Sequence, residues 1–176
     1  MKKLNKFMLI IEGPDHSGKT KLCNHLTEKY RFNYYHCGVQ PDIKQYHDDV
    51  LALALNDVSK YNSNFIIDRM HLSEEVYGNI FRNGAVYSWK EFNRQIEDKC
   101  KELGIVYKLI VCLPPKEIVV KGHAARNADG NEMFDTVDSV YDAYSKIYED
   151  AEVPMYKYDF TEDADYTELD KFLENL

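Results

Sequence analysis

The sequence predicts an α/β fold of three layers, with a five-stranded parallel sheet flanked by helices and a short lid. Five short apolar runs alternate along the chain with segments of helical spacing. Strands that alternate with helices form parallel sheets covered on both faces. A glycine-rich motif at 13–20 separates the first apolar run from the first helical segment. With 176 residues and no internal repeat or low-complexity linker, residues 1–176 are expected to form one domain.

The predicted strands are short apolar runs that end at polar or turn-forming residues. The first run, Phe-Met-Leu-Ile-Ile, is long enough for a buried strand, and the fourth ends at the pair Pro114-Pro115. The last run alternates apolar and polar side chains, as expected of a strand with one covered face. The five strands are predicted at 7–11, 33–37, 65–67, 106–113 and 155–160.

The predicted helices have apolar residues spaced three and four apart. Leu22 and Leu26 share a face of the first helix, and Ser88 and Gly104 are expected to cap and end the fourth. Leu51, Leu53, Leu55 and Val58 are expected to supply the apolar surface of the second. The helices are predicted at 21–30, 43–58, 73–81, 89–103, 117–125, 132–150 and 166–173, with a loop at 127–130.

The stretch Gly-Pro-Asp-His-Ser-Gly-Lys-Thr at 13–20 fits the phosphate-loop pattern G-x-x-x-x-G-K-[ST] without a mismatch. Its glycines let main-chain N–H groups turn toward phosphate oxygens, and the following helix adds partial positive charge. The lysine can reach the β- and γ-phosphates, and the threonine hydroxyl can bind Mg²⁺. The motif therefore predicts ATP and Mg²⁺ as ligands. The residues expected to hold the nucleotide are Gly13, Asp15, His16, Ser17, Gly18, Lys19 and Thr20.

The composition narrows the class of partner. Lys plus Arg is 22 and Asp plus Glu is 30, a net charge of −8, which argues against a broad nucleic-acid surface. The four cysteines form no C-x-x-C pair, and Cys23 and Cys112 are expected to be small buried hydrophobes. The first apolar run is too short for a signal-peptide core, and no run approaches membrane-spanning length. These features predict a cytoplasmic protein that binds a small molecule and no membrane.

Polar residues that follow the strands are expected to meet at one edge of the sheet. Right-handed crossovers place the carboxyl ends of parallel strands together, where ligands bind. The phosphate loop follows the first strand, and Asp68-Arg69 follows the third. The segment 121–132 leaves the fourth strand on the same side and is predicted to be a lid. Whether His16, Lys121 and His123 contact phosphate is left open.

The two motifs together resemble those of the thymidylate kinase family, within the group of P-loop kinases of deoxynucleosides and deoxynucleotides. Residues 7–20 are similar to that family's F-x-x-x-E-G-x-D-x-x-G-K-T, and residues 68–78 to its D-R-x-x-x-S-x-x-A-Y-Q. Four residues of the second motif match, namely Asp68, Arg69, Ser73 and Tyr77. The order of later elements is also similar, so the resemblance spans most of the chain. Relatives are often dimers, so a homodimer is among the expectations.

The resemblance implies phosphoryl transfer from ATP to a deoxynucleoside 5′-monophosphate, and it implies a role for each matching residue. Asp15 would bind the sugar 3′-hydroxyl, and Arg69 the acceptor phosphate. Ser73 and Tyr77 would line the base and sugar pocket. The catalytic residues would be Lys19, Asp68, Arg69 and Arg126, with Thr20 and Asp68 at the metal.

The sequence departs from the family on the acceptor side. The family's Arg-Glu-Pro signature after the second strand corresponds to the run His-Cys-Gly-Val-Gln-Pro at 36–41, which has no arginine. Arg126 stands alone where the family's lid is rich in arginine. A deoxynucleoside kinase acting on a free 5′-hydroxyl therefore remains an alternative, although its usual catalytic glutamate after the second strand is missing. A kinase of a hydroxyl within a nucleic acid is disfavoured by charge. A nucleotide-binding switch without catalysis is disfavoured because the chain has no N-K-x-D motif.

Overall fold

The five strands form one parallel sheet in a computed structural model that describes residues 6–127 and 136–176. The strand order is β2-β3-β1-β4-β5, so β1 lies at the centre. Every pair of neighbouring strands is parallel. The bounds are β1 Phe7–Glu12, β2 Phe32–His36, β3 Asn64–Asp68, β4 Val106–Cys112 and β5 Met155–Tyr158. The predicted five-stranded parallel sheet is confirmed.

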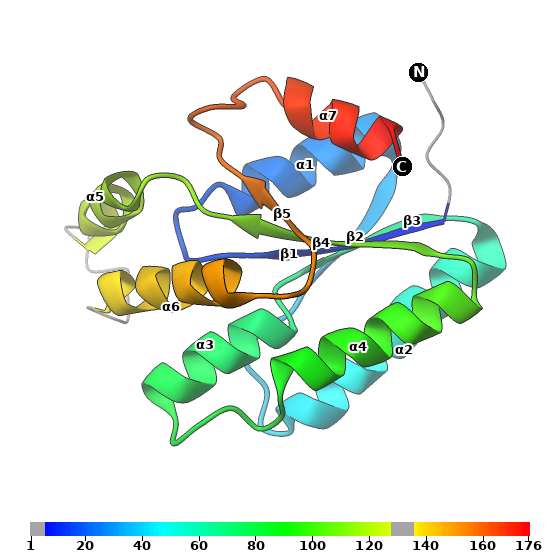
Figure 1. The fold of residues 1–176 in the computed structure, drawn as a ribbon, viewed down its shortest axis with the longest axis horizontal. Coiled ribbons are helices and arrows are strands. Elements are labelled where there is room, and N and C mark those ends of the chain that lie inside the picture. The colour runs from blue at the N-terminus through cyan, green and yellow to red at the C-terminus, as the bar shows by residue number, and fades with distance from the viewer. Residues whose placement is uncertain (1–5, 128–135) are drawn as a thin grey trace.

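Helices cover both faces of the sheet, which gives the three predicted layers (Figure 1). α1 and α7 lie on one face, and α2, α3, α4 and α6 lie on the other, with α5 at one end beside α6. The bounds are α1 Lys19–Tyr30, α2 Ile43–Tyr61, α3 His71–Phe81, α4 Trp89–Glu102, α5 Lys116–Asn127, α6 Val137–Asp150 and α7 Thr167–Glu174.

The central strand β1 contributes to both halves of the core, because successive side chains point to opposite faces. Met8 and Ile10 pack among the helices of the larger layer. Leu9 and Ile11 pack against α1 and α7. These four side chains are fully buried, so the run reads as continuously apolar, as expected of a strand covered on both sides. The strand that precedes the phosphate loop is therefore held rigidly in the middle of the molecule.

Several predicted boundaries differ from the structure by a few residues. α1 begins at Lys19 rather than at 21, because the helix starts directly behind Gly18 of the phosphate loop. β2 begins and ends one residue earlier than predicted, and α2 continues to Tyr61. The prediction that Leu53 belongs to the apolar face of α2 is wrong, since half of that side chain is exposed.

The ends of α4 and α5 can also be compared with the predicted boundaries. Ser88 caps α4, and Gly104 follows its end with a φ of 64°, as expected. The predicted lid begins inside a helix, since α5 runs without a break to Asn127, where a loop was expected to start. The rest of the lid to 132, the loop at 128–130 and the predicted start of the sixth helix at 132 lie outside the described residues. In the described residues no helix has both the length and the apolar character needed to span a membrane.

Candidate active site

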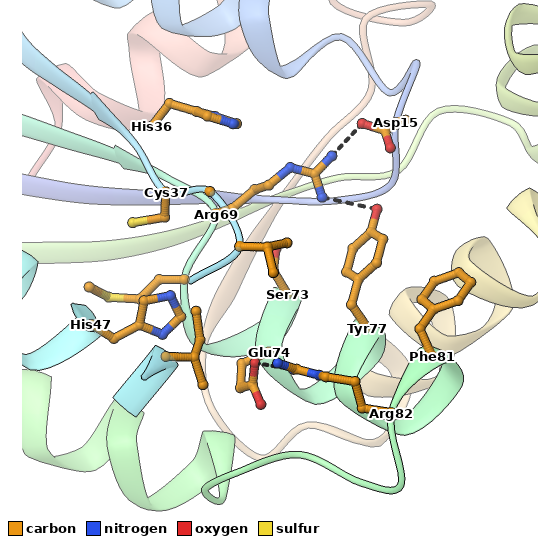
Figure 2. A pocket seen from close by; sticks show the side chains of 14 residues that line it. Asp15, His36, Cys37, His47, Arg69, Ser73, Glu74, Tyr77, Phe81 and Arg82 are labelled. Atoms are coloured by element: carbon orange, nitrogen blue, oxygen red, sulfur yellow. Dashed lines mark hydrogen bonds and ion pairs between the residues drawn. The ribbon is translucent and has the colours of Figure 1, made fainter. Parts of the chain in front are cut away.

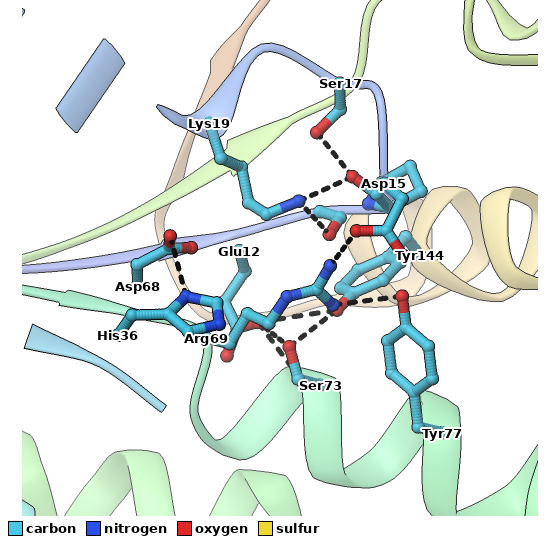
Figure 3. Close-up of polar contacts among 12 residues, drawn as sticks. Glu12, Asp15, Ser17, Lys19, His36, Asp68, Arg69, Ser73, Tyr77 and Tyr144 are labelled. Atoms are coloured by element: carbon cyan, nitrogen blue, oxygen red, sulfur yellow. Dashed lines mark hydrogen bonds and ion pairs between the residues drawn. The ribbon is translucent and has the colours of Figure 1, made fainter. Parts of the chain in front are cut away.

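The carboxyl ends of β1 and β3 bring the phosphate loop and the Asp68-Arg69 pair together, as predicted. Ile11 of β1 pairs with Asp68 of β3, and the Arg69 N–H donates to the Ile11 carbonyl at 2.9 Å. His36, at the end of β2, pairs in register with Asp68. Figure 3 shows Lys19, Asp68, His36, Arg69 and Asp15 gathered around one space at this edge of the sheet.

The phosphate loop depends on glycine at both ends. Gly13 and Gly18 have φ angles of 137° and 90°, which side-chain-bearing residues rarely adopt. A Cβ at Gly13 would lie 2.5 Å from the Cys112 carbonyl oxygen, and one at Gly18 would lie 2.7 Å from the Phe160 ring. The loop is thus packed tightly against β4 and the segment after β5, which fixes its shape before any ligand binds.

Lys19 lies inside the loop that it is expected to serve. Its Nζ donates to the main-chain oxygens of Gly13 at 2.9 Å and Pro14 at 2.6 Å, and Ser17 Oγ donates to the Pro14 oxygen at 2.8 Å. Burial, followed by the charge of Arg69, lowers the pKa of Lys19 to about 8. The negative charge of a bound polyphosphate would stabilise the charged form of this buried ammonium group.

Asp68 is a buried carboxylate with one uncommitted oxygen. Its Oδ2 accepts from the Tyr34 hydroxyl at 2.8 Å and lies 3.0 Å from His36 Nδ1. Its Oδ1 is buried and has no hydrogen-bond partner among the residues that the structure describes. A buried carboxylate oxygen left unpaired is costly unless it serves a ligand. This oxygen fits a hydrated Mg²⁺, and the exposed Thr20 near the start of α1 offers the second oxygen that the motif requires.

Arg69 is held in a strained backbone conformation with its guanidinium fixed on two sides. Its φ of 68° is unusual for a residue other than glycine. Nη2 contacts the Asp15 carboxylate, and Nη1 donates to the Tyr77 hydroxyl at 2.9 Å. Burial alone would raise the pKa of Asp15, but Arg69 and Lys19 outweigh it and keep that pKa below its usual value. The Arg69 guanidinium therefore links the phosphate loop, through Asp15, to α3, through Tyr77 (Figure 3).

Glu12 is a buried carboxylate beside the site that the sequence analysis does not single out. It is fully buried at the end of β1 and accepts hydrogen bonds from the first turn of α3. Burial raises the pKa of Glu12, and the donors from Ser73 and the Met70 N–H oppose that rise. The signal was present, since the family pattern has glutamate directly before the loop glycine. Ser73, predicted to line the substrate pocket, donates its hydroxyl to Glu12.

A pocket of about 420 Å³ opens beside the Asp15–Arg69 pair, and its size suits a small organic ligand. One end of the pocket lies near the phosphate loop. The other end lies between α2 and α3. Figure 2 shows Asp15, Arg69 and Tyr77 at the first end and Glu74 and Arg82 at the second. Ser73 and Tyr77, which the sequence analysis places in a substrate pocket, line it together with His36, Cys37, His47 and Phe81.

α5 approaches the phosphate loop from the other side. The rings of His16 and His123 meet edge to face, with centroids 5.8 Å apart. His123 is buried, whereas Lys121 and Arg126 are exposed. The structure thus brings Gly13, Asp15, Ser17, Gly18, Lys19, Asp68, Arg69, Ser73 and Tyr77 into one region. Arg126, predicted to be catalytic, lies in the last turn of α5, and its role stays a prediction.

Comparisons with known proteins agree with this architecture. No family model matches the sequence, and no curated protein matches it either. YorR from Bacillus subtilis, solved in complex with phosphorylated GDP, has a TM-score of 0.71 at 21% identity over 95% of each chain. Deoxyadenosine kinase from M. mycoides with bound dCTP has a TM-score of 0.57 at 15% identity, covering 96% of this chain and 100% of that one. The chain therefore has the fold of the P-loop kinases.

Proposed function

We propose that the protein transfers the γ-phosphoryl group of Mg·ATP to a small nucleotide held in the 420 Å³ pocket. One observation carries the proposal: the phosphate loop with Lys19 and the Arg69 guanidinium lie on opposite sides of one space at the sheet edge (Figure 3). A donor tail in the loop would face an acceptor in the pocket. The fold and the ligands of the similar structures support this arrangement, since one is a deoxynucleoside kinase and another was solved with a guanine nucleotide.

The reaction asks this chain mainly for positioning and charge. The bond between the γ-phosphorus and the β,γ-bridging oxygen breaks, a bond from phosphorus to the acceptor oxygen forms, and ADP leaves. Negative charge spreads over the equatorial oxygens, and Lys19 and Arg69 would balance it from two sides. Thr20 and Asp68 would hold Mg²⁺, which neutralises phosphate charge when bound.

We infer a deoxynucleoside 5′-monophosphate as the acceptor, because Arg69 lines the pocket at the end near the phosphate loop and a phosphate acceptor needs no general base. Binding an acceptor phosphate would require Arg69 to exchange Asp15 for that phosphate. The released Asp15 carboxylate could then accept a sugar hydroxyl, as the resemblance to thymidylate kinases implies.

A second candidate is a nucleoside kinase acting on a free 5′-hydroxyl. One observation favours it: His36 lines the pocket and contacts the buried Asp68 at 3.0 Å. A histidine oriented by a carboxylate is an arrangement that can accept a proton from a hydroxyl. This contact was not expected, because the sequence shows no carboxylate at the corresponding position of β2.

The deciding experiment is a coupled assay of ADP release with Mg·ATP and each common nucleoside and nucleoside monophosphate. Release that depends on a monophosphate supports the first candidate, and release that depends on a nucleoside supports the second. ATP binding without acceptor-dependent release would indicate a nucleotide-binding switch. A cytoplasmic location and a homodimer stay predictions from the sequence.

A further inference from the structure

The far end of the acceptor pocket contains an arginine held by a buried carboxylate. Arg82 follows the last residue of α3, and its Nη2 contacts the Glu74 carboxylate two turns earlier on the same helix. The Glu74 side chain is only 2% exposed, whereas that of Arg82 is 38% exposed. Both line the pocket, at the end away from Asp15 and Arg69 (Figure 2). The pair lies outside the residues assigned above to phosphoryl transfer.

Glu74 is already committed on both oxygens. Oε1 accepts the Val86 N–H at 2.9 Å, and Oε2 receives Arg82. The carboxylate therefore fixes the arginine and the start of the next loop. Glu74 affects the pocket by orienting Arg82, because a buried carboxylate with two fixed donors holds its partner in one position.

Arg82 keeps a pair of donors for a ligand. Glu74 contacts a single terminal nitrogen, so one edge of the planar guanidinium retains two parallel N–H groups. Glu74 is its one side-chain partner among the described residues. The pocket lining also includes the apolar Ile43 and Met70 and the neutral His47. Burial lowers the pKa of His47 to about 4, so its ring is uncharged at neutral pH.

The acceptor must enter the pocket with its reacting oxygen near the phosphate loop. On the proposed function, on which this inference rests, the sugar then lies between the two ends, and the base reaches the Glu74–Arg82 pair. Two parallel N–H donors match a base edge with two adjacent acceptors. Guanine presents O6 and N7, the pairing that arginine most often makes with bases. Cytosine presents O2 and N3.

We infer that Arg82, held by Glu74, selects an acceptor whose base presents two adjacent hydrogen-bond acceptors, guanine or cytosine, over adenine and thymine. Adenine places an amino donor beside each ring acceptor on its exposed edges, and thymine places an N–H between its two carbonyl groups. Either base would place one of its own N–H donors opposite an N–H donor of Arg82. This preference is the opposite of the thymine specificity that the resemblance to thymidylate kinases implies.

The test measures kcat/KM with dGMP, dCMP, dAMP and dTMP, and with the four nucleosides, for the wild type and variants. Wild-type values for guanine or cytosine should exceed those for adenine and thymine by about tenfold or more, and the separate substrates tell the two bases apart. Arg82→Ala should lose about tenfold to a hundredfold on the preferred base and little on adenine. Arg94→Ala removes an exposed arginine of α4 and should change no ratio between bases.

Arg82→Lys guards against a folding defect, because lysine can still pair with Glu74 but lacks the two-donor fork. It should lose base discrimination while it keeps turnover with adenine. A wild type that prefers adenine or thymine, or an Arg82→Lys variant with unchanged ratios, overturns the inference. If no acceptor supports ADP release, the proposed function fails. Calorimetric titration with dGMP, dCMP, dAMP and dTMP then decides the base preference, and equal or absent binding of all four overturns it.

Discussion

The carboxylate of Glu12, the last residue of β1, lies 2.5 Å from the Ser73 hydroxyl in the first turn of α3. The same side chain accepts the main-chain N–H groups of Met70 at 2.8 Å, Leu72 at 3.0 Å and Ser73 at 3.2 Å. These donors are the unpaired N–H groups at the start of a helix. Glu12 thus caps α3 from another element and fixes the short segment that carries Arg69.

We expect Glu12→Gln to lower both stability and activity. One acceptor oxygen becomes an amino group that faces N–H donors in a buried site, which should cost about 2–4 kcal/mol of unfolding free energy. The same change should reduce kcat/KM, since the backbone of Arg69 loses its anchor. Denaturant unfolding and the ADP-release assay measure the two effects. Glu75→Gln is the control, because that residue bonds Asn79 near the helix surface; equal behaviour of the two variants would contradict the role of Glu12.

Lys19→Ala should greatly slow transfer while the fold persists. The ammonium group contacts main-chain oxygens of the phosphate loop and would contact the transferring phosphoryl group, so its loss should reduce kcat by about a hundredfold to a thousandfold. Circular dichroism and steady-state turnover measure the two properties. Lys21→Ala, two residues on and exposed, should behave like the wild type. Near-normal turnover of the Lys19 variant would refute the assignment.

Arg69→Ala should affect the acceptor far more than ATP. Its guanidinium points toward the pocket and is fixed by Asp15 and Tyr77, whereas the phosphate loop supplies its own donors (Figure 3). We expect kcat/KM for the acceptor to fall by about a hundredfold or more, with little change in the Kd for ATP. Separate titrations of the two ligands distinguish the effects, and a parallel loss of ATP affinity would argue against an acceptor role.

The sequence predicted the donor half of the site well because that half is encoded locally. The phosphate loop is eight consecutive residues, and its glycines, lysine and threonine act through backbone geometry that any such run adopts. The strands were recognisable because a strand buried on both faces is a continuous apolar run. Asp68 and Arg69 follow directly from a strand end.

The acceptor half could not be predicted in the same way, because most of its contacts join residues far apart in the chain. Glu12 reaches Ser73 across 61 positions. His36 meets Asp68 only because their strands pair in parallel register. The contact of Arg82 with Glu74 spans only eight positions, but it joins the residue that ends α3 to a buried side chain of the same helix, which no sequence pattern encodes. Hydrophobic periodicity carries no information about such polar contacts. The error at Leu53 has another cause: Leu51, Leu55 and Val58 share one face of α2, and a residue two positions from Leu51 lies off that face.

Stability should fall as the pH is lowered from 6.5 toward 4. Burial lowers the pKa of His71 to about 3 and that of His47 to about 4, from an ordinary 6.5. At a pH between 6.5 and the lowered pKa, each histidine is protonated in the unfolded chain but not in the folded protein. Each therefore reduces the unfolding free energy by up to about 1.4 kcal/mol for every pH unit by which the pH falls. Urea unfolding at pH 7, 6 and 5 measures the slope. His71→Gln should show a smaller slope, and a wild type with constant stability over this range would contradict the prediction.

Gly78→Ala tests whether the helix surface beside Arg82 can accommodate a side chain at position 78. A Cβ at this position would lie 2.8 Å from Ala85 Cα and 3.1 Å from Arg82 Nη2. The first contact is with backbone that cannot move without shifting the loop after α3, and the second pushes the guanidinium off Glu74. Alanine favours a helix over glycine by about 1 kcal/mol, whereas forced overpacking costs about 1–3 kcal/mol. We therefore expect a net loss of unfolding free energy together with weaker discrimination between bases.

Gly38→Ala is the matched control for stability, since an added Cβ there would meet no atom within 4 Å. It should leave unfolding unchanged or slightly favour the folded state by restricting the unfolded chain. The comparison separates the crowding at Gly78 from any general effect of replacing glycine. Gly78→Ala could prove as stable as Gly38→Ala and keep the base preference of the wild type. In that case the position of Arg82 would not depend on the close approach of Gly78 to Ala85 and Arg82, and the proposed way in which Glu74 holds Arg82 would be wrong.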